Sequence, residues 1–467
     1  MAPKTIFHTT EKSNFILNMS PVTLRKLIRR FLIICAVLPF IGGALWLVSD
    51  KNAYIGAGLL SFSGFVSILL FLVCLLKRDV LFTKNISYFI VLGIAAMAAV
   101  SAVLAYNTDV SIFGNQGRYE GLLAILSYAG LFFAGTLIAD KSDVVKVFDV
   151  IIGVGIIQSI IAVFERLSLI KTGFEDLSAI ALEKVFLGTG TSGSPIFFGS
   201  FITLLTGIAL AGACYDKNVK RRIVYGCAAV LFIVDAYFTD SIVPLIGIPC
   251  AFLIILIFEI IKKRKSGKKS GKFITSPSGV LLLFIIAFAV IKISSLAIEG
   301  LSVYDKGIAW QDSFYKNFIS GQLSYKLEGF YSHTWKETLG IIKAHPLEGT
   351  GPDCLVYPQL KEVPYNIPGS VNTFDKPYND YLYTAATRGV ASLLLYLALL
   401  FFAFKRMSKG ISAFVKEKDD WYRIALFSGI AAYLVIMFFS ASSIYVAPYF
   451  WLLLGFAFSK KLDAPQK

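Results

Sequence analysis

The sequence predicts an all-α polytopic membrane protein with about 12 transmembrane helices and a large extracytoplasmic loop that contains short helices. Two observations carry this prediction. The chain of 467 residues is 56% hydrophobic and only 16% charged, whereas a soluble globular chain is usually about half apolar and about a quarter charged. The apolar residues also form runs of about 18 to 23, the length of helix that crosses roughly 30 Å of hydrocarbon.

Each apolar run is predicted to be a helix, because hydrocarbon cannot hydrogen-bond an open backbone. The predicted spans lie near residues 31–49, 54–76, 88–106, 120–139, 147–164, 195–214, 222–238, 241–261, 279–298, 385–404, 423–439 and 443–459. They divide the chain into an N-terminal membrane region (1–298), a large extracytoplasmic loop (299–384) and a C-terminal membrane region (385–467). The short interval between the seventh and eighth spans is also compatible with a re-entrant segment.

The basic residues predict the orientation of these spans. A formal net charge of +15 would indicate nucleic-acid binding in a soluble protein, but in a membrane protein lysine and arginine mark the cytoplasmic loops. Most of the 45 lysines and arginines fall on one side when both termini share it. We therefore expect cytoplasmic termini, contact of the basic run 262–269 with membrane lipids, and no nucleic-acid partner.

Three loops are then predicted to lie outside the membrane, at residues 107–119, 165–194 and 299–384. The third is too long for a turn. Apolar residues recur at helical spacing from Glu328 to Lys343, which predicts a short amphipathic helix that ends before Pro346. We expect the remainder of this loop to be irregular.

The first outside loop places Arg118 and Glu120 at the mouth of the fourth span, between Gly117 and Gly121. A guanidinium in this place suits a bidentate contact with a phosphate or diphosphate. An ion pair between Arg118 and Glu120, or an Arg118 side chain that extends to the membrane interface, is an equally open interpretation. The second loop ends in a glycine-rich segment, 188–195, which lacks the Gly-Lys-Ser/Thr end of a nucleotide-binding P-loop.

The third loop gathers aromatic and ionisable side chains of the kinds that bind sugars. Aromatic rings stack on the apolar faces of pyranoses, and proton transfer from a sugar hydroxyl needs His, Asp or Glu within hydrogen-bond reach. His333 and His345 are the two histidines expected outside, and a plain loop or capping role is open for either one. The other candidate groups of this loop are Tyr331, Trp335, Asp353, Asp375, Tyr378 and Asn379.

Three strings in these loops resemble the O-antigen ligase and O-antigen polymerase superfamily of bacterial membrane glycosyltransferases. Residues 117–122 (Gly-Arg-Tyr-Glu-Gly-Leu) are similar to an early Arg-x-x-Gly segment of that family. Residues 346–352 (Pro-Leu-Glu-Gly-Thr-Gly-Pro) resemble its Pro-Leu-x-Gly-x-Gly-Pro turn. Residues 375–382 (Asp-Lys-Pro-Tyr-Asn-Asp-Tyr-Leu) look like its His-Asn-x-Tyr-Leu motif, with Tyr378 in the position of the histidine.

The resemblance implies transfer of an undecaprenyl-diphosphate-linked oligosaccharide to a glycan, lipid or other acceptor on the outer face of the bacterial cytoplasmic membrane. It implies neither a nucleotide sugar nor a metal cofactor. Outside arginines would hold the lipid diphosphate, and a histidine would activate the acceptor hydroxyl. Of the family's polar residues, Arg118 lines up well. Together with the residue types of the loops, this makes Arg118, Glu120, Tyr331, Trp335 and Asn379 the candidate substrate-binding residues.

The tyrosine in the histidine position leaves three possibilities for catalysis. Another group replaces the histidine, or substrate positioning is sufficient, or the protein has lost catalysis and binds lipid-linked glycan as an accessory protein. The candidate catalytic residues are His333, His345, Asp353, Asp375 and Tyr378. A membrane transporter is a further alternative, although the ionisable residues within the spans are few and scattered.

Overall fold

The computed structural model describes residues 19–48, 52–77, 85–167, 188–239, 241–266, 331–362, 374–414, 421–459 and 462. All regular secondary structure in these residues is helical, which confirms the predicted all-α class. The predicted span 279–298 lies outside the described residues, as does the start of the helix predicted from Glu328.

The helices are α1 (Pro21–Val48), α2 (Ala53–Leu76), α3 (Ile86–Val103), α4 (Thr108–Phe113), α5 (Leu122–Thr136), α6 (Lys141–Arg166), α7 (Pro195–Tyr215), α8 (Val219–Phe238), α9 (Ile242–Ser266), α13 (Ser332–Ala344), α14 (Val356–Glu362), α15 (Asp380–Phe414), α16 (Trp421–Ile436) and α17 (Ala447–Phe458). Each predicted span in the described part of the chain overlaps one of these helices.

Seven of these helices are long and apolar enough to cross a membrane, namely α1, α2, α3, α6, α7, α9 and α15. Helices α5, α16 and α17 are apolar but shorter. Helix α8 carries Lys220, Arg221 and Arg222 in its first turn and Asp235 near its other end, so it is more charged than a typical span. The chain is thus a multi-helix membrane protein, and the predicted number of 12 spans is not confirmed.

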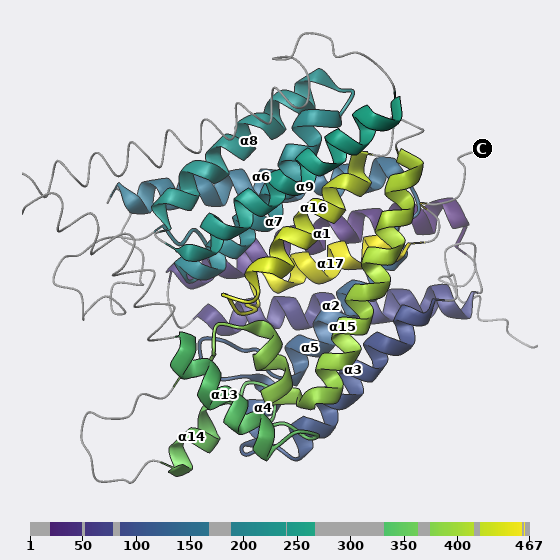
Figure 1. Cartoon of the computed structure of the whole chain (residues 1–467). Coiled ribbons are helices and arrows are strands. Elements are labelled where there is room, and N and C mark those ends of the chain that lie inside the picture. Colours follow the sequence, from purple (N-terminus) through teal and green to yellow (C-terminus); the bar gives the residue numbers. More distant parts are fainter. Residues whose placement is uncertain are drawn as a thin grey trace, which may run out of the picture.

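Helix α7 lies at the centre of the bundle and is buried along almost its whole length. It packs against α8, α9 and α16, while α5 packs against α2 and α17 (Figure 1). Close packing of α7 and α16 depends on small residues, because a Cβ on Gly207 would lie 2.5 Å from the Gly429 nitrogen. The outer helices expose apolar side chains such as Phe62, Leu92 and Phe401, as expected for a surface that faces lipid.

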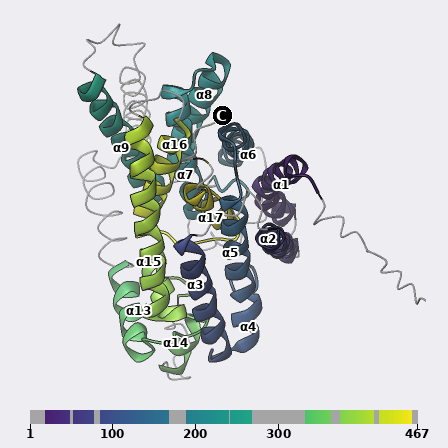
Figure 2. The same ribbon diagram turned by 90° about the vertical axis from the view of Figure 1, so that its right-hand side faces the viewer.

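Helices α4, α13 and α14 gather at one end of the molecule, beside the ends of α3 and α15 (Figures 1 and 2). Helix α13 confirms the predicted amphipathic helix in its described part. Helix α4 lies in the predicted loop 107–119, for which no helix was predicted. Helix α14 lies in the part of 299–384 that was expected to be irregular, although short helices were predicted for that loop as a whole. Both are only one to two turns long, too short to show a helical period in the sequence, and the Asn107 side chain caps α4 by accepting from the Val110 amide at 3.2 Å.

Helix α15 is broken at Gly389, whose φ of 82° and ψ of 159° are not helical. The turn formed by residues 345–351 fits into this break. The backbone bonds run from Thr350 N to Ala386 O at 2.9 Å, from Gly351 N to Thr387 O at 3.1 Å, and from Val390 N to Pro346 O at 2.8 Å. These bonds satisfy backbone groups that a broken helix in a membrane protein would otherwise leave unpaired.

Candidate active site

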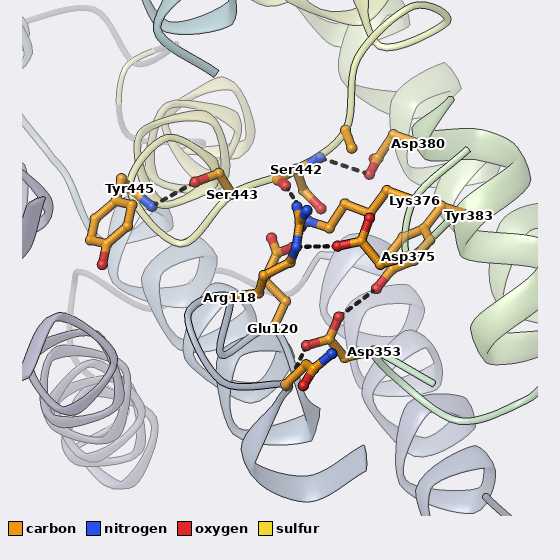
Figure 3. Close-up of polar contacts among 12 residues, drawn as sticks. Arg118, Glu120, Asp353, Asp375, Lys376, Asp380, Tyr383, Ser442, Ser443 and Tyr445 are labelled. Carbon is orange, nitrogen blue, oxygen red and sulfur yellow. Dashed lines mark hydrogen bonds and ion pairs between the residues drawn. The ribbon is translucent and has the colours of Figure 1, made fainter. Parts of the chain in front are cut away.

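The site is built where the loop between α4 and α5 meets the segment 374–379, which leads into α15 (Figure 3). Two ion pairs join these segments, and the positive residue belongs to the loop in one pair and to the segment 374–379 in the other. Arg118 of the loop pairs with Asp375 of the segment, and Glu120 of the loop pairs with Lys376. The two predicted candidates Arg118 and Asp375 are thus brought together, although they are far apart in the sequence.

The pair of Glu120 and Lys376 is buried, and we call it the inner pair. The side chains of Lys376 and Glu120 are 1% and 5% exposed. Lys376 also donates to the Ser442 carbonyl at 2.7 Å and lies 5.4 Å from the centre of the Phe197 ring. Removing one member of a buried ion pair costs roughly 3–5 kcal/mol, so the inner pair fixes the two segments together.

Glu120 therefore occupies a different place from the one expected. The sequence suggested a substrate contact or a pair with Arg118, whereas the structure pairs Glu120 with Lys376. Its Oε1 atom is buried and has no hydrogen-bond partner among the described residues. We therefore interpret Glu120 as a residue that positions Arg118, because its pair with Lys376 holds the loop that carries Arg118.

The pair of Arg118 and Asp375 is the outer pair, and it is accessible to solvent. The side chain of Arg118 is 29% exposed and that of Asp375 is 34% exposed. The backbone turns sharply on both segments, with positive φ at Gly117 and Tyr119 and again at Tyr378. These turns present the guanidinium and the carboxylate to each other at the edge of the cluster (Figure 3).

Asp353 lies beside the two pairs and is almost fully buried. Its carboxylate accepts from the Asn115 amide at 2.6 Å and from the Tyr383 hydroxyl at 3.1 Å. Burial raises the pKa of Asp353 to about 6, while these hydrogen bonds and the charge of Arg118 oppose the increase. A carboxyl group with this pKa exchanges a proton close to neutral pH.

Tyr378, in the string that resembles the His-Asn-x-Tyr-Leu motif, lies close to Arg118. Burial raises the pKa of the Tyr378 phenol, and Arg118 opposes this increase. A neutral phenol is a poor proton acceptor at neutral pH. The next residue, Asn379, caps the start of α15, because its side-chain oxygen accepts from the Leu382 amide at 3.1 Å.

An aromatic cluster lies against the segment 374–379. The Trp335 indole donates to the Pro377 carbonyl at 3.0 Å, and the Tyr331 hydroxyl donates to the Phe439 carbonyl at 3.2 Å. The rings of Tyr331 and Trp335 meet edge to face, with centroids 5.9 Å apart. Tyr331 is buried and Trp335 is only partly buried, so Trp335 is the better placed of the two for stacking on a sugar.

The two histidines do not join this cluster by any contact within the described part of the chain. His345 uses both ring nitrogens elsewhere, toward the Tyr106 hydroxyl at 2.9 Å and toward Glu348 at 3.0 Å. His333 is exposed on α13. The geometry therefore favours Asp353 and Asp375 over the histidines as candidate proton acceptors.

Sequence reasoning missed Lys376, Tyr383 and the Ser442 carbonyl. Lys376 lies in the string 375–382 that resembles the family motif, but a lysine in a polar loop gives no signal of burial. Its partner Glu120 is 256 positions away in the sequence. Only the folded chain reveals this pairing.

Comparison with known proteins identifies the region that contains most of this site. Residues 227–397 match the O-antigen ligase family. The match supports the O-antigen ligase and polymerase superfamily, and it confirms the resemblance seen in the motifs. A comparison with curated proteins found no match.

The matched O-antigen ligase region includes Asp353, Asp375, Lys376 and Tyr378 but ends before α16 and begins after the loop of Arg118. Arg118 and Glu120 thus enter the site from outside the matched region. Their assignment to the site rests on the two ion pairs that bind them to residues 375 and 376.

Proposed function

We propose that the protein transfers an undecaprenyl-diphosphate-linked oligosaccharide to a glycan or other acceptor on the outer face of a bacterial cytoplasmic membrane. The observation that carries the proposal is the position of Arg118. The inner pair fixes its loop against the O-antigen ligase region, and its guanidinium remains partly exposed at the edge of an acidic and aromatic cluster.

The proposed chemistry uses Arg118 as the anchor of the leaving group. A guanidinium binds diphosphate oxygens through two parallel hydrogen bonds and stabilises the negative charge that develops on departure. The acceptor oxygen attacks the anomeric carbon, and the bond between that carbon and the diphosphate oxygen breaks toward the diphosphate. Trp335 offers an aromatic face for a sugar, and we propose no metal or nucleotide in the reaction.

The proton of the acceptor hydroxyl requires an acceptor other than Tyr378. Asp375 is in direct contact with Arg118, and the positive charge of Arg118 acts on Asp353. We propose these two carboxylates as the candidate proton acceptors. His333 and His345 remain weaker candidates because their contacts lie elsewhere. A general base contributes about 10²- to 10⁴-fold to the rate of such a reaction.

The second candidate function is an accessory protein that binds lipid-linked glycan without turnover. The observation that favours it is Tyr378, whose phenol is kept neutral by burial in the position where the family carries a histidine. The same anion site at Arg118 would serve binding alone.

Turnover separates these two functions. The purified full-length protein is mixed in detergent with undecaprenyl-diphosphate-linked oligosaccharide, and released undecaprenyl diphosphate and elongated glycan are measured. We expect release that depends on the presence of the glycan acceptor. Saturable binding of the donor without release would instead favour the accessory protein, and absence of both would contradict either function.

A further inference from the structure

We propose that Asp375 is an internal competitor for the donor diphosphate at Arg118, and that the carboxylate which the donor displaces takes the proton of the acceptor hydroxyl. This inference rests on the proposed function. It assigns two successive roles to one side chain: a placeholder before the donor binds and a catalytic base afterwards.

The first step of the argument is the difference in exposure between the two ion pairs. The inner pair is almost completely buried, whereas about a third of each side chain in the outer pair is exposed. A solvent-exposed ion pair contributes only about 0–1 kcal/mol. A diphosphate carries more negative charge than one carboxylate and matches the two-pronged guanidinium, so it can replace Asp375 at Arg118.

The second step is that the backbone around Asp375 is anchored on both sides. Lys376 is held by Glu120 and by the Ser442 carbonyl. On the preceding side, the Gln359 side chain accepts from the Phe374 amide at 3.1 Å and donates to the Phe374 carbonyl at 2.9 Å. Displacement of Asp375 therefore requires rotation of one side chain rather than movement of the segment, and the freed carboxylate stays at the site.

The third step is that the other acids are already committed. Both carboxylate oxygens of Asp353 accept hydrogen bonds, from Asn115 and from Tyr383. Glu120 neutralises Lys376 in the interior. Asp375 differs from these acids because its partner is Arg118. A donor diphosphate that binds Arg118 would therefore leave Asp375 without its ion pair.

The exchange links donor binding to proton transfer. Once the diphosphate occupies Arg118, Asp375 loses its positive partner, and an unpaired carboxylate accepts a proton more readily than a paired one. The acceptor O–H bond then breaks with its proton moving to Asp375, the acceptor oxygen bonds to the anomeric carbon, and the electron pair of the old glycosidic bond leaves with the diphosphate.

The test compares wild-type protein with Asp375→Asn, and uses Asp109→Asn as a control that removes one charge from exposed α4. Binding is measured by calorimetry with farnesyl diphosphate, which carries the diphosphate without a sugar. We expect Asp375→Asn to bind this probe up to about fivefold more tightly, the factor that corresponds to about 1 kcal/mol. We expect Asp109→Asn to bind it as the wild type does.

The same preparations are then assayed for release of undecaprenyl diphosphate from lipid-linked oligosaccharide. We expect release by Asp375→Asn to be slower by about 100-fold or more, whereas Asp375→Glu keeps both the competitor and the base and stays near the wild type. Tighter probe binding by Asp375→Asn also demonstrates that this variant is folded.

Unchanged or weaker binding of farnesyl diphosphate by Asp375→Asn would overturn the competition. Tighter binding together with wild-type release would overturn the proton transfer. Arg118→Ala separates these failures from a failure of the proposed function: it should lose probe binding, and if it binds the probe as the wild type does, the anion site itself is misplaced.

Discussion

Asp353 shows how burial and hydrogen bonding determine the behaviour of a single acid in this site. It has no ion-pair partner among the described residues, and burial raises its pKa from 3.8 to about 6. The folded protein therefore holds this proton more tightly than the unfolded chain. Unfolding releases the proton between these two pH values, so the contribution of Asp353 to stability is present at low pH and is lost as the pH rises to about 6.

We therefore predict that the unfolding temperature of the wild type in detergent falls between about pH 4 and pH 7, with Asp353 contributing up to about 3 kcal/mol. Asp353→Asn keeps an amide oxygen for the Asn115 donor and gains an amide nitrogen that can donate to the Tyr383 hydroxyl oxygen. It cannot ionise, so its decrease should be smaller. Thermal unfolding at a series of pH values measures this, with Asp109→Asn as the control that keeps the wild-type profile. Parallel pH profiles for wild type and Asp353→Asn would show that burial does not shift this group.

At the scale of elements, the turn of residues 345–351 packs into the break in α15. Both lie in the region that matches the O-antigen ligase family. Gly389 has a φ of 82°, and a Cβ at this residue would lie 2.0 Å from the Leu347 carbonyl oxygen. A Cβ on Gly349 of the turn, whose φ is 68°, would lie 2.5 Å from the Thr387 carbonyl carbon of α15. The glycines of the Pro-Leu-x-Gly-x-Gly-Pro string thus allow the turn to enter the break, and this contact sets the direction in which α15 leaves the site.

Gly389→Ala should destabilise the protein, because alanine is strained at positive φ and its Cβ collides with backbone that cannot move aside. A strained backbone conformation costs about 1–3 kcal/mol, and the collision adds to this cost. Gly340→Ala is the matched control, since Gly340 is in α13 with open space around it. The measurement is thermal unfolding in detergent, and equal unfolding temperatures for the two variants would contradict the close contact.

The sequence predicted the long elements of this fold better than the short ones. Helix α13 follows from the helical spacing of Trp335, Leu339 and Ile342 and from the stop at Pro346. Helices α4 and α14 could not be predicted, because one or two turns show no period and α4 depends on the cap from Asn107.

The candidate site was predictable in its residue types but not in its pairings. Arg118 and Asp375 were found from their chemistry and motifs, but their contact depends on two loops that meet only in the fold. The buried Lys376 was not found at all.

At the scale of the whole molecule, the site joins two parts of the chain that differ in their relation to known proteins. The matched region supplies Asp353, Asp375 and Lys376, and the N-terminal helices supply Arg118 and Glu120. Hydropathy predicted the membrane class correctly, because long apolar runs need only length and composition. It was less reliable for the number of spans, since α8 is charged and α5, α16 and α17 are shorter than a typical span.

The role of Arg118 in holding the donor diphosphate is tested most directly by the rate at which purified protein releases undecaprenyl diphosphate from lipid-linked oligosaccharide. The rate is compared between wild type, Arg118→Ala and Lys336→Ala, which removes one positive charge from exposed α13. We predict that Arg118→Ala lowers the rate by about 100-fold or more, because the leaving diphosphate loses its cation, and that Lys336→Ala has no effect. Release at the wild-type rate by a folded Arg118→Ala protein would contradict the assignment.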